Sequence, residues 1–429
     1  MRDFYKFYNI DKDIVDEIEL AETKIKTQFT EVDKIVFHNQ QKVLMAMQDA
    51  NLGSGDFFWP TGYGYADPGR DKTETIYKNV FNTEDALVRP SIASGTHAIY
   101  LGLDSVLNAG DELLYISGIP YDTMQKSLGY VGNEKNNLKS KGVSVKYVPL
   151  DENDQFDKKA ILDAINDKTK VVAIQRSTGY SLRRAFNIEE IGEVIDCVKA
   201  HKKDVIIFVD NCYGEFTEYD EPTDVGADLM AGSLIKNPGA GIAFSGGYLV
   251  GKKDLIECAA NNLTAPGIGK EVGLTFGTTR FTLQGLFLAP HVVGQAMKGA
   301  YLIAQVMKDR GYKIIPDETF SKSDIVQTII FEDKEALKQF TIGIQQAGAV
   351  DSYAIPTAWD MPGYEDQVIM AAPGFVEGSS IEISCDAPMR EPYAAYYQGG
   401  ITYEHAKIAL MFGLRNLEKN NCNYFNNHK

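Results

Sequence analysis

The sequence predicts an α/β protein with a mainly parallel sheet, because short apolar runs alternate with helical patterns between residues 85 and 250. Five runs have the length of buried strands, namely Glu112–Ser117, Val143–Leu150, Lys170–Ile174, Val205–Asp210 and Gly246–Val250. Helical spacing separates them, as in Lys158–Ile165 and Ile188–Ala200. This alternation is typical of βαβ units. Ligands bind beyond the carboxyl ends of strands in such sheets, so the residues after each run are site candidates.

The remaining chain predicts two further regions. Apolar residues recur at helical spacing over residues 10–50, whereas residues 51–72 are rich in Gly, Pro and aromatic side chains, which indicates an ordered loop. A chain of 429 residues allows two or three domains. The expected division is an N-terminal helical arm over 1–55, a large domain over 56–285 and a smaller C-terminal α/β domain over 286–429.

The C-terminal part predicts strands at Ile325–Phe331 and Ser380–Ser384 and a terminal helix at Tyr403–Leu417. The long apolar stretch Gly285–Met307 is interrupted by Pro290 and several polar residues. It therefore predicts a buried helix with a break rather than a membrane span.

Charge and cysteine content restrict the function classes. Lys and Arg total 43 against 59 Asp and Glu, which gives a formal charge of −16. This balance argues against binding to nucleic acid or to an anionic membrane, since both need basic surface. The five cysteines are scattered without a C-x-x-C pair, and the acidic N-terminus has no leader-like apolar run. We therefore expect a protein of the reducing cytoplasm.

A turn of small residues, Ser94-Gly95-Thr96-His97, precedes an apolar run that starts at Ala98. A helix that begins at such a turn presents free backbone N–H groups and the positive end of its dipole, which suit a phosphate. The same pattern is that of an ordinary helix N-cap, so the turn alone leaves both interpretations open.

Two further residues lie where a ligand would bind. Asp210 ends the run Val205–Asp210, where a carboxylate could contact a ligand or cap the next turn. Lys236 lies among small and apolar residues in GSLIKNPGAG. Burial lowers the pKa of an amine, and the neutral amine is the nucleophile that forms a Schiff base. A surface lysine in a glycine-rich loop is the alternative.

Together, the phosphate turn, the strand-end Asp and the later Lys resemble the pattern of pyridoxal phosphate (PLP) enzymes of fold type I. Within that class the sequence resembles the cystathionine lyase and methionine γ-lyase group. More narrowly, it resembles the aluminium resistance branch of that group. The branch is suggested by TGYGYADPGRDKTE, SGTHAI, VDNCYGEF, GSLIKNPGAG and EPYAAYYQGGITYEHAK. The resemblance implies an aspartate aminotransferase-like fold, with a seven-stranded, mainly parallel sheet in the large domain and a smaller C-terminal α/β domain.

The resemblance assigns roles in cofactor binding. Lys236 would form the Schiff base with PLP and act as base at the substrate's Cα. Asp210 would pair with the pyridinium nitrogen and keep it protonated. Ser233 would bind the phosphate, together with the backbone N–H groups of Gly95 and Thr96.

Other roles concern the ring and the substrate. Tyr121 would stack on the pyridine ring and assist proton transfer. The group's Asn-Pro turn beside the ring is replaced here, so Gln175 or Arg176 would contact the PLP oxygen or the substrate. Arg390 would bind the substrate carboxylate through its planar guanidinium. An exposed salt bridge to a nearby glutamate is the alternative for Arg390.

The segment Tyr63-Gly64-Tyr65 resembles the loop through which a neighbouring subunit of the group touches the cofactor phosphate. Tyr63 would make that contact. The group usually has an Arg at the position of Tyr65, so the remaining ligand stays open, with Arg70 as a candidate. Because the group forms dimers that pair into tetramers, we expect a homodimer or homotetramer with its active sites at the subunit interface. The aromatic segment Phe57–Tyr65 suits such an interface.

The function implied is a PLP-dependent lyase that cleaves the C–S bond of a sulfur-containing amino acid by β- or γ-elimination. Its products would be a thiol, ammonia and a 2-oxo acid, and we expect no metal site. Transamination and γ-replacement remain alternatives, because the same residues serve them. A PLP-binding protein without turnover is another. A non-catalytic metal-binding protein is the rival of a different class, since the acidic segment Glu215–Asp224 offers the oxygen ligands that hard cations prefer.

Overall fold

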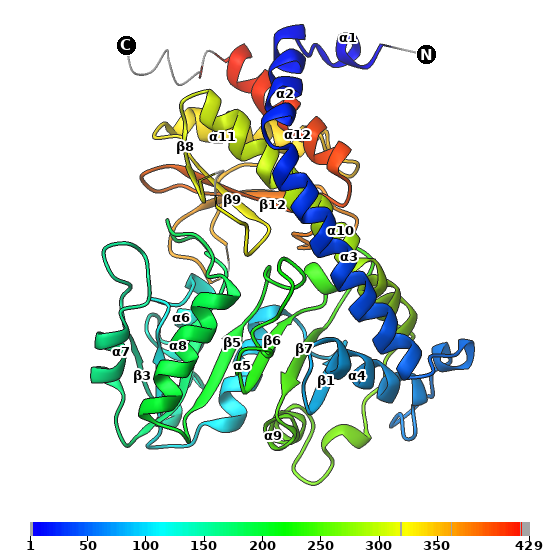
Figure 1. Cartoon of the computed structure of the whole chain (residues 1–429), viewed down its shortest axis with the longest axis vertical. Helices are drawn as coiled ribbons and strands as arrows, with labels where there is room; N and C mark the ends of the chain where they lie inside the picture. The colour runs from blue at the N-terminus through cyan, green and yellow to red at the C-terminus, as the bar shows by residue number, and fades with distance from the viewer. Residues whose placement is uncertain (1–2, 318–319, 362, 421, 423–429) are drawn as a thin grey trace. The chain divides into compact units, whose positions relative to one another are not determined.

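A computed structural model describes residues 3–317, 320–361, 363–420 and 422 of the chain (Figure 1). The chain forms two compact units. The large unit comprises His38–Gly179 and Ala185–Ala289, and the small unit comprises Met1–Phe37, Tyr180–Arg184 and Pro290–Lys429. The first division falls inside helix α3 (Lys26–Asp49), so the predicted arm 1–55 contributes to both units.

The large unit is built on a seven-stranded sheet with the order β1-β7-β6-β5-β4-β2-β3. Its strands are β1 (Asp85–Arg89), β2 (Glu112–Tyr115), β3 (Ser144–Tyr147), β4 (Thr169–Gln175), β5 (Ile206–Asp210), β6 (Leu229–Ser233) and β7 (Gly247–Gly251). Among the described pairs, β7 runs antiparallel to β1 and β6, and the others are parallel. The predicted fold class is confirmed. Strands β1 and β6 were not among the predicted runs.

Helices flank this sheet (Figure 1). They are α4 (Pro68–Val80), α5 (Gly95–Val106), α6 (Asp122–Leu128), α7 (Lys158–Ala164), α8 (Ile188–His201) and α9 (Lys253–Leu263), with 3₁₀ turns at Ser54–Phe57, Lys139–Lys141, Asn237–Gly239 and Gly269–Glu271. Helix α4 begins inside the stretch 51–72 that was predicted as loop. It begins there because the Asp67 side chain accepts hydrogen bonds from the N–H groups of Gly69 and Arg70, each at 3.1 Å.

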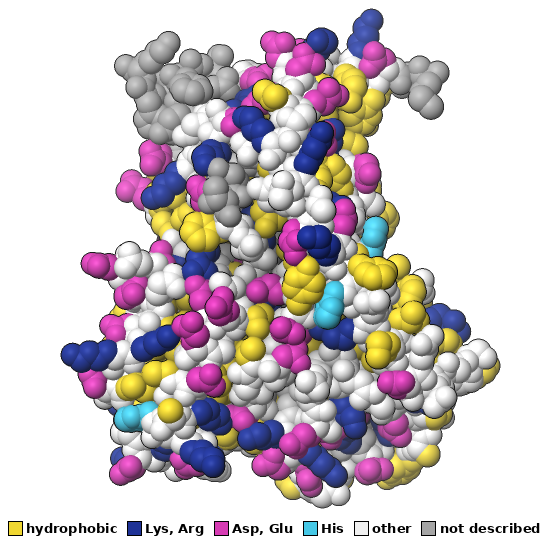
Figure 2. All heavy atoms as spheres, viewed as in Figure 1, with side chains coloured by type: hydrophobic (Ala, Val, Ile, Leu, Met, Phe, Trp, Pro, Cys, Tyr) yellow, Lys and Arg dark blue, Asp and Glu magenta, His cyan; other side chains and the backbone are white. Residues whose placement is uncertain are grey.

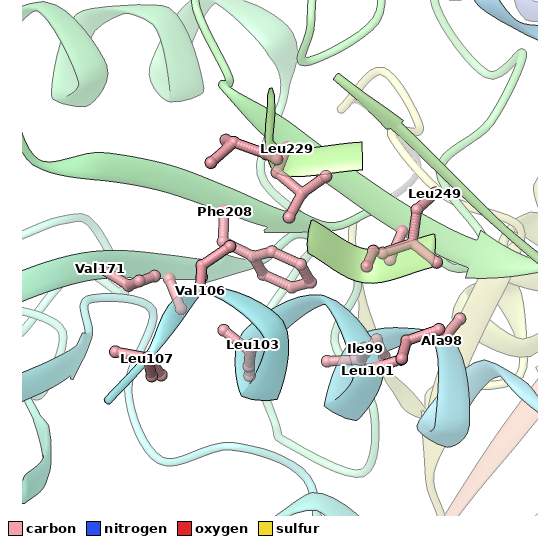
Figure 3. Packing of buried hydrophobic residues seen from close by; sticks show 14 of the residues in the cluster. Ala98, Ile99, Leu101, Leu103, Val106, Leu107, Val171, Phe208, Leu229 and Leu249 are labelled. Carbon is pink, nitrogen blue, oxygen red and sulfur yellow. The ribbon is translucent and has the colours of Figure 1, made fainter. Parts of the chain in front are cut away.

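Helix α5 packs closely on the central strands, and this packing fixes where the helix begins. Figure 3 shows Phe208 of β5 and Leu249 of β7 against this helix. A Cβ atom on Gly102 would lie 2.7 Å from Phe208 Cε2, so only a glycine lets the helix approach this closely. The helix N-terminus is therefore held against the strands that end at the candidate site.

The small unit contains a five-stranded antiparallel sheet with the order β10-β11-β12-β9-β8. Its strands are β8 (Lys313–Ile315), β9 (Val326–Ile330), β10 (Val368–Ala371), β11 (Ser384–Pro388) and β12 (Ala394–Gln398). Its helices are α1 (Phe4–Tyr8), α2 (Lys12–Lys24), α11 (Lys334–Gln346) and α12 (Tyr403–Lys419), while α10 (Thr279–Asp309) begins in the large unit and ends in the small one.

The predicted helix at Tyr403–Leu417 and the strand at Ile325–Phe331 are confirmed by α12 and β9. The strand predicted at Ser380–Ser384 is wrong, because the strand begins only at Ser384. A turn precedes it, in which Glu382 N donates to Ser379 O at 3.1 Å. The Glu382 carboxylate also accepts the N–H groups of Phe375 and Val376, which keeps this segment out of the sheet.

The surface charge and the helices of the protein can be compared with the expectation that it binds neither nucleic acid nor a membrane. Basic and acidic side chains are interspersed on the face shown in Figure 2, rather than gathered into one basic stripe. The buried helix predicted over Gly285–Met307 is confirmed by α10, but the break predicted there is wrong, because the helix continues through Pro290. Within the ranges that the structure describes, no helix combines the length and the apolar character needed to cross a membrane.

Candidate active site

Asp210 and Lys236 come from neighbouring parallel strands. Asp210 is the last residue of β5 and pairs with Ala231 of β6, and Lys236 follows the end of β6 at Ser233. The Asp210 side chain is buried, and its Oδ1 accepts the N–H of Cys212 at 3.1 Å. Burial raises the pKa of Asp210, while the Lys236 amine and this hydrogen bond oppose the rise. The sheet thus places an acid and an amine at one edge.

The pKa of the Lys236 amine is shifted in the direction opposite to the one expected from its burial. Burial alone would lower this pKa, but the acidic groups around it, first Cys212 and then the tyrosines Tyr213 and Tyr121 and Asp210, raise it well above its ordinary value. The prediction of a neutral amine is therefore wrong. Burial also raises the pKa of the Cys212 thiol, although the Lys236 amine opposes this rise.

The start of α5 lies beside this pair. A Cβ atom on Gly95 would lie 3.2 Å from Cys212 Sγ, 3.3 Å from Ser233 Cβ and 3.8 Å from Lys236 Nζ. Because Gly95 has no side chain, the N-terminus of the helix lies close to the lysine and to the end of β6. The first N–H groups of a helix have no acceptor within it, so they are available to a ligand there.

The same turn also caps the helix, so the two interpretations of this segment are compatible. The Ser94 hydroxyl accepts the N–H of His97 at 3.1 Å. The N–H of Ala93 donates to His97 Nδ1 at 3.0 Å, and burial lowers the pKa of this imidazole. His97 is therefore neutral, with its proton on Nε2.

Tyr121 is held at the site from two directions. Its N–H donates to Gln175 Oε1 at 3.0 Å, and its hydroxyl shares a hydrogen bond of 3.0 Å with Thr96 Oγ1. Burial raises the pKa of Tyr121, which keeps the phenol protonated. Gln175 ends β4 opposite Asp210 in register, and its amide nitrogen donates to Ser177 O. These bonds show Gln175 positioning Tyr121, and its contact with a cofactor stays a prediction.

Arg176 does not face the site, so its predicted contact with cofactor or substrate is wrong. Its guanidinium is fully buried and donates to Asn211 Oδ1 at 2.9 Å, Gly214 O at 3.0 Å and Glu218 Oε1 at 2.8 Å. A second carboxylate, that of Glu221, lies 3.6 Å from Nη1. Arg176 thus fixes the conformation of the loop that follows Asp210 through these hydrogen bonds.

The acidic segment Glu215–Asp224 is largely committed within the protein. Glu215 is buried and accepts the hydroxyl proton of Tyr248 at 2.7 Å, and burial raises the pKa of this carboxyl to about 8. Glu221 is buried near Arg176 and accepts the N–H of Phe216. Over the described part of the chain, no three His, Cys, Asp or Glu side chains are grouped to hold a metal ion.

We expect Arg176→Met to lower the free energy of unfolding by about 3–5 kcal/mol, because it removes one of the cations near the buried Glu221 carboxylate and leaves the buried acceptors of the guanidinium without a donor. Urea denaturation of the variant and the parent measures this difference. Arg280→Met is the matched control, since Arg280 is exposed on α10 and we expect a change within about 1 kcal/mol. Equal stability of Arg176→Met and the parent would contradict the role given to this arginine.

The segment around Tyr63 lies at the surface of the large unit. The Tyr63 side chain is 73% exposed, and its ring lies 5.4 Å from that of Tyr65. Arg70 is buried and donates to Gly64 O at 2.8 Å and to Gly273 O at 3.3 Å. The interpretation of Arg70 as a phosphate ligand is therefore wrong, while the role of Tyr63 toward a neighbouring subunit stays a prediction.

Arg390 belongs to the small unit. Its Nη1 lies 3.0 Å from Asp366 Oδ2, and its Nη2 donates to Tyr180 O at 3.4 Å. Both charged side chains are about two fifths exposed, at 42% and 41%. The salt bridge that the sequence left open is thus present, with Asp366 rather than a glutamate. Binding of a substrate carboxylate by Arg390 stays a prediction.

Sequence reasoning missed Tyr213 and Cys212. The Lys236 amine lies 4.0 Å from the centroid of the Tyr213 ring, and Cys212 adjoins Gly95. The two residues lie two and three positions after Asp210, so the rule that ligands bind beyond strand ends could have pointed to them.

Comparison with known proteins identifies the family. The methionine gamma-lyase family model matches residues 14–418. An uncharacterized protein of Bacillus subtilis is 48% identical over 381 residues, which cover 89% of this chain and 90% of that protein. The structure of a carbon-sulfur lyase involved in aluminum resistance from Clostridium novyi NT superimposes with a TM-score of 0.92 and 47% identity, over 96% of this chain and 97% of that one.

A more distant structure shares the fold. The pyridoxal-5'-phosphate-dependent protein YhfS from Escherichia coli superimposes with a TM-score of 0.59 at 16% identity, over 89% of this chain and 97% of that one. With the site geometry and a family match over nearly its whole length, the chain belongs to the methionine gamma-lyase family.

Proposed function

We propose that this protein is a PLP-dependent carbon–sulfur lyase that converts a sulfur-containing amino acid into a thiol, ammonia and a 2-oxo acid. One observation carries the proposal: Asp210 ends β5, Lys236 follows the neighbouring strand β6, and the turn at Gly95 lies close to the lysine. The Clostridium novyi relative is described as a carbon–sulfur lyase and is 47% identical to this chain.

The residues at this edge fit PLP. Lys236 would bind the aldehyde carbon, and Asp210 would accept the pyridinium N–H. A phosphate would meet the N–H groups of Gly95 and Thr96 at the positive end of α5. The Ser233 hydroxyl accepts the N–H of Ile235 at 3.3 Å and keeps its own proton to donate to that phosphate. A side chain at position 95 would occupy the space between the helix N-terminus, Ser233 and Lys236 where the phosphate would bind.

When bound, PLP supplies an electron sink that stabilises negative charge at the substrate's Cα. The chain's own residues then handle the protons. Lys236 Nζ takes the proton from Cα as general base. Tyr121, kept protonated by its raised pKa and fixed through Thr96, donates a proton to the departing sulfur. The Asp210 carboxylate would balance the positive charge of the protonated pyridinium nitrogen.

Substrate binding and assembly complete the proposal. Arg390 would exchange its exposed bond with Asp366 for the substrate carboxylate, a bidentate contact that guanidinium makes well. The exposed Tyr63 segment would contribute to the site of a second copy in a homodimer or homotetramer. We place the protein in the cytoplasm. All five cysteines lie among the described residues and are free thiols, which supports a reducing compartment.

The visible spectrum of the purified protein, before and after addition of L-cystathionine, tests the function. We expect an absorption band of Lys236-bound cofactor that changes on addition, followed by a 2-oxo acid without any amino acceptor. Pyruvate would indicate β-elimination and 2-oxobutyrate γ-elimination. A responding band without 2-oxo acid would favour transamination or γ-replacement instead. No band after incubation with PLP would overturn the proposal.

A further inference from the structure

An aromatic residue beside the reactive lysine has an unusual backbone conformation. Tyr213 has a φ of 72°, in the left-handed region that bulky L-residues rarely adopt. Phe216, in the same loop, has a φ of 64°. Such conformations cost free energy and persist only where the surrounding structure imposes them, which is most common at functional sites.

Buried hydrogen bonds from two other segments impose this conformation. Arg176 Nη1 donates to the carbonyl of Gly214, and Asn237 Nδ2 donates to the carbonyl of Tyr213, each at 3.0 Å. Both donors are fully buried. Asn237 directly follows Lys236, so one hydrogen bond connects the lysine segment to the tyrosine segment.

The result of this arrangement is a contact between a charge and a ring face. The Lys236 amine lies 4.0 Å from the centroid of the Tyr213 ring, within the range of a cation–π interaction. We propose that Tyr213 is a positioning residue whose ring face holds the charged Lys236 amine at the end of β6. This inference rests on the proposed function, because it concerns the lysine that would bind PLP.

The ring acts on the lysine in one direction. The negative face of an aromatic ring attracts the ammonium form and not the neutral amine, so it delays the loss of the proton as the pH rises. Removal of the ring should therefore let Lys236 become a free amine at lower pH. The ring face and not the phenol hydroxyl makes the cation–π contact, so Phe should keep this contact at position 213.

The experiment measures the ionisation of Lys236 without cofactor. Cofactor-stripped protein is labelled with acetic anhydride over a pH series, and mass spectrometry quantifies acetylation of Lys236. We expect Tyr213→Phe to match the parent. We expect Tyr213→Leu to lower the pKa of Lys236 by about one unit, a tenfold gain in free amine at a given pH. Exposed Lys146 is the reference within each sample and should not change.

A second series guards against misfolding of Tyr213→Leu. Phenylalanine analogues with increasing ring fluorination at position 213 keep the shape of the side chain and weaken the negative ring face. The pKa of Lys236 should fall stepwise along the series. A constant pKa along the series, or a Tyr213→Phe protein that behaves like Tyr213→Leu, would overturn the inference.

The rate of PLP capture by the same proteins separates this inference from the proposed function. If the parent captures no PLP, the proposed function fails, while the labelling result still decides the role of Tyr213. If the parent captures PLP and all variants share one pKa for Lys236, the role of Tyr213 alone fails.

Discussion

Lys236→Ala is expected to lower kcat by at least about a thousandfold, because the variant loses both the amine that binds the cofactor and the base at Cα. Among the described groups that lie near Asp210 and Gly95, Lys236 supplies the amine, and no second amine is present there. Release of 2-oxo acid from L-cystathionine, measured with saturating PLP, gives the comparison.

Lys158→Ala is the matched control for this experiment. Lys158 is exposed and pairs with Glu193 on α8, so we expect its replacement to leave kcat unchanged. Turnover at the parental rate by Lys236→Ala would show that the chemistry occurs without this lysine, and the proposed mechanism would be rejected.

Asp210→Asn has the second largest expected effect. An amide cannot hold the negative charge that keeps a bound pyridinium protonated, so we expect kcat to fall by about 10²–10⁴-fold. The variant retains Lys236 and the helix N-terminus at Gly95, so it should still bind PLP. The measurements are kcat and the position of the visible absorption band, which should differ from that of the parent.

Asp228→Asn provides a control of the same residue type. Asp228 is buried at the opposite edge of the sheet, where it bonds Lys199, Lys252 and the N–H of Ile207. Its replacement should reduce stability and leave kcat of the folded protein unchanged. If the two Asn variants lose the same fraction of kcat, Asp210 has no special role toward the ring.

The sheet was largely predictable because its strands are apolar runs of standard length. The rule that ligands bind beyond strand ends led from the run Val205–Asp210 to Asp210. The small and apolar neighbours of Lys236 pointed to that residue, and the resemblance gave both their roles. Strand β6 was not predicted, because its sequence LMAGS contains small residues rather than a β-branched run. Its place in the sheet follows from pairing with β5 and β7, which local sequence does not encode.

Side-chain direction and local charge were less predictable. Gln175 and Arg176 are adjacent, but consecutive residues at a strand end point to opposite sides, so one reaches Tyr121 and the other enters the loop after Asp210. The pKa of Lys236 depends on acidic groups that only the fold brings near it. Burial, which can be inferred from composition, is only one of the effects on this pKa. It lowers the pKa, so composition alone predicted a shift in the wrong direction.

The position of β7 has a consequence for biosynthesis. Strand β7 comes last in chain order, yet it inserts between β1 and β6, and it joins residues 85–89 to residues 247–251. Until a ribosome has released residue 251, strand β1, which leads into the turn that carries Gly95, has no partner in the sheet. Contacts so distant in sequence form slowly. A nascent chain can therefore fix the strand that enters the Gly95 turn only after the last strand of the large sheet has been synthesised.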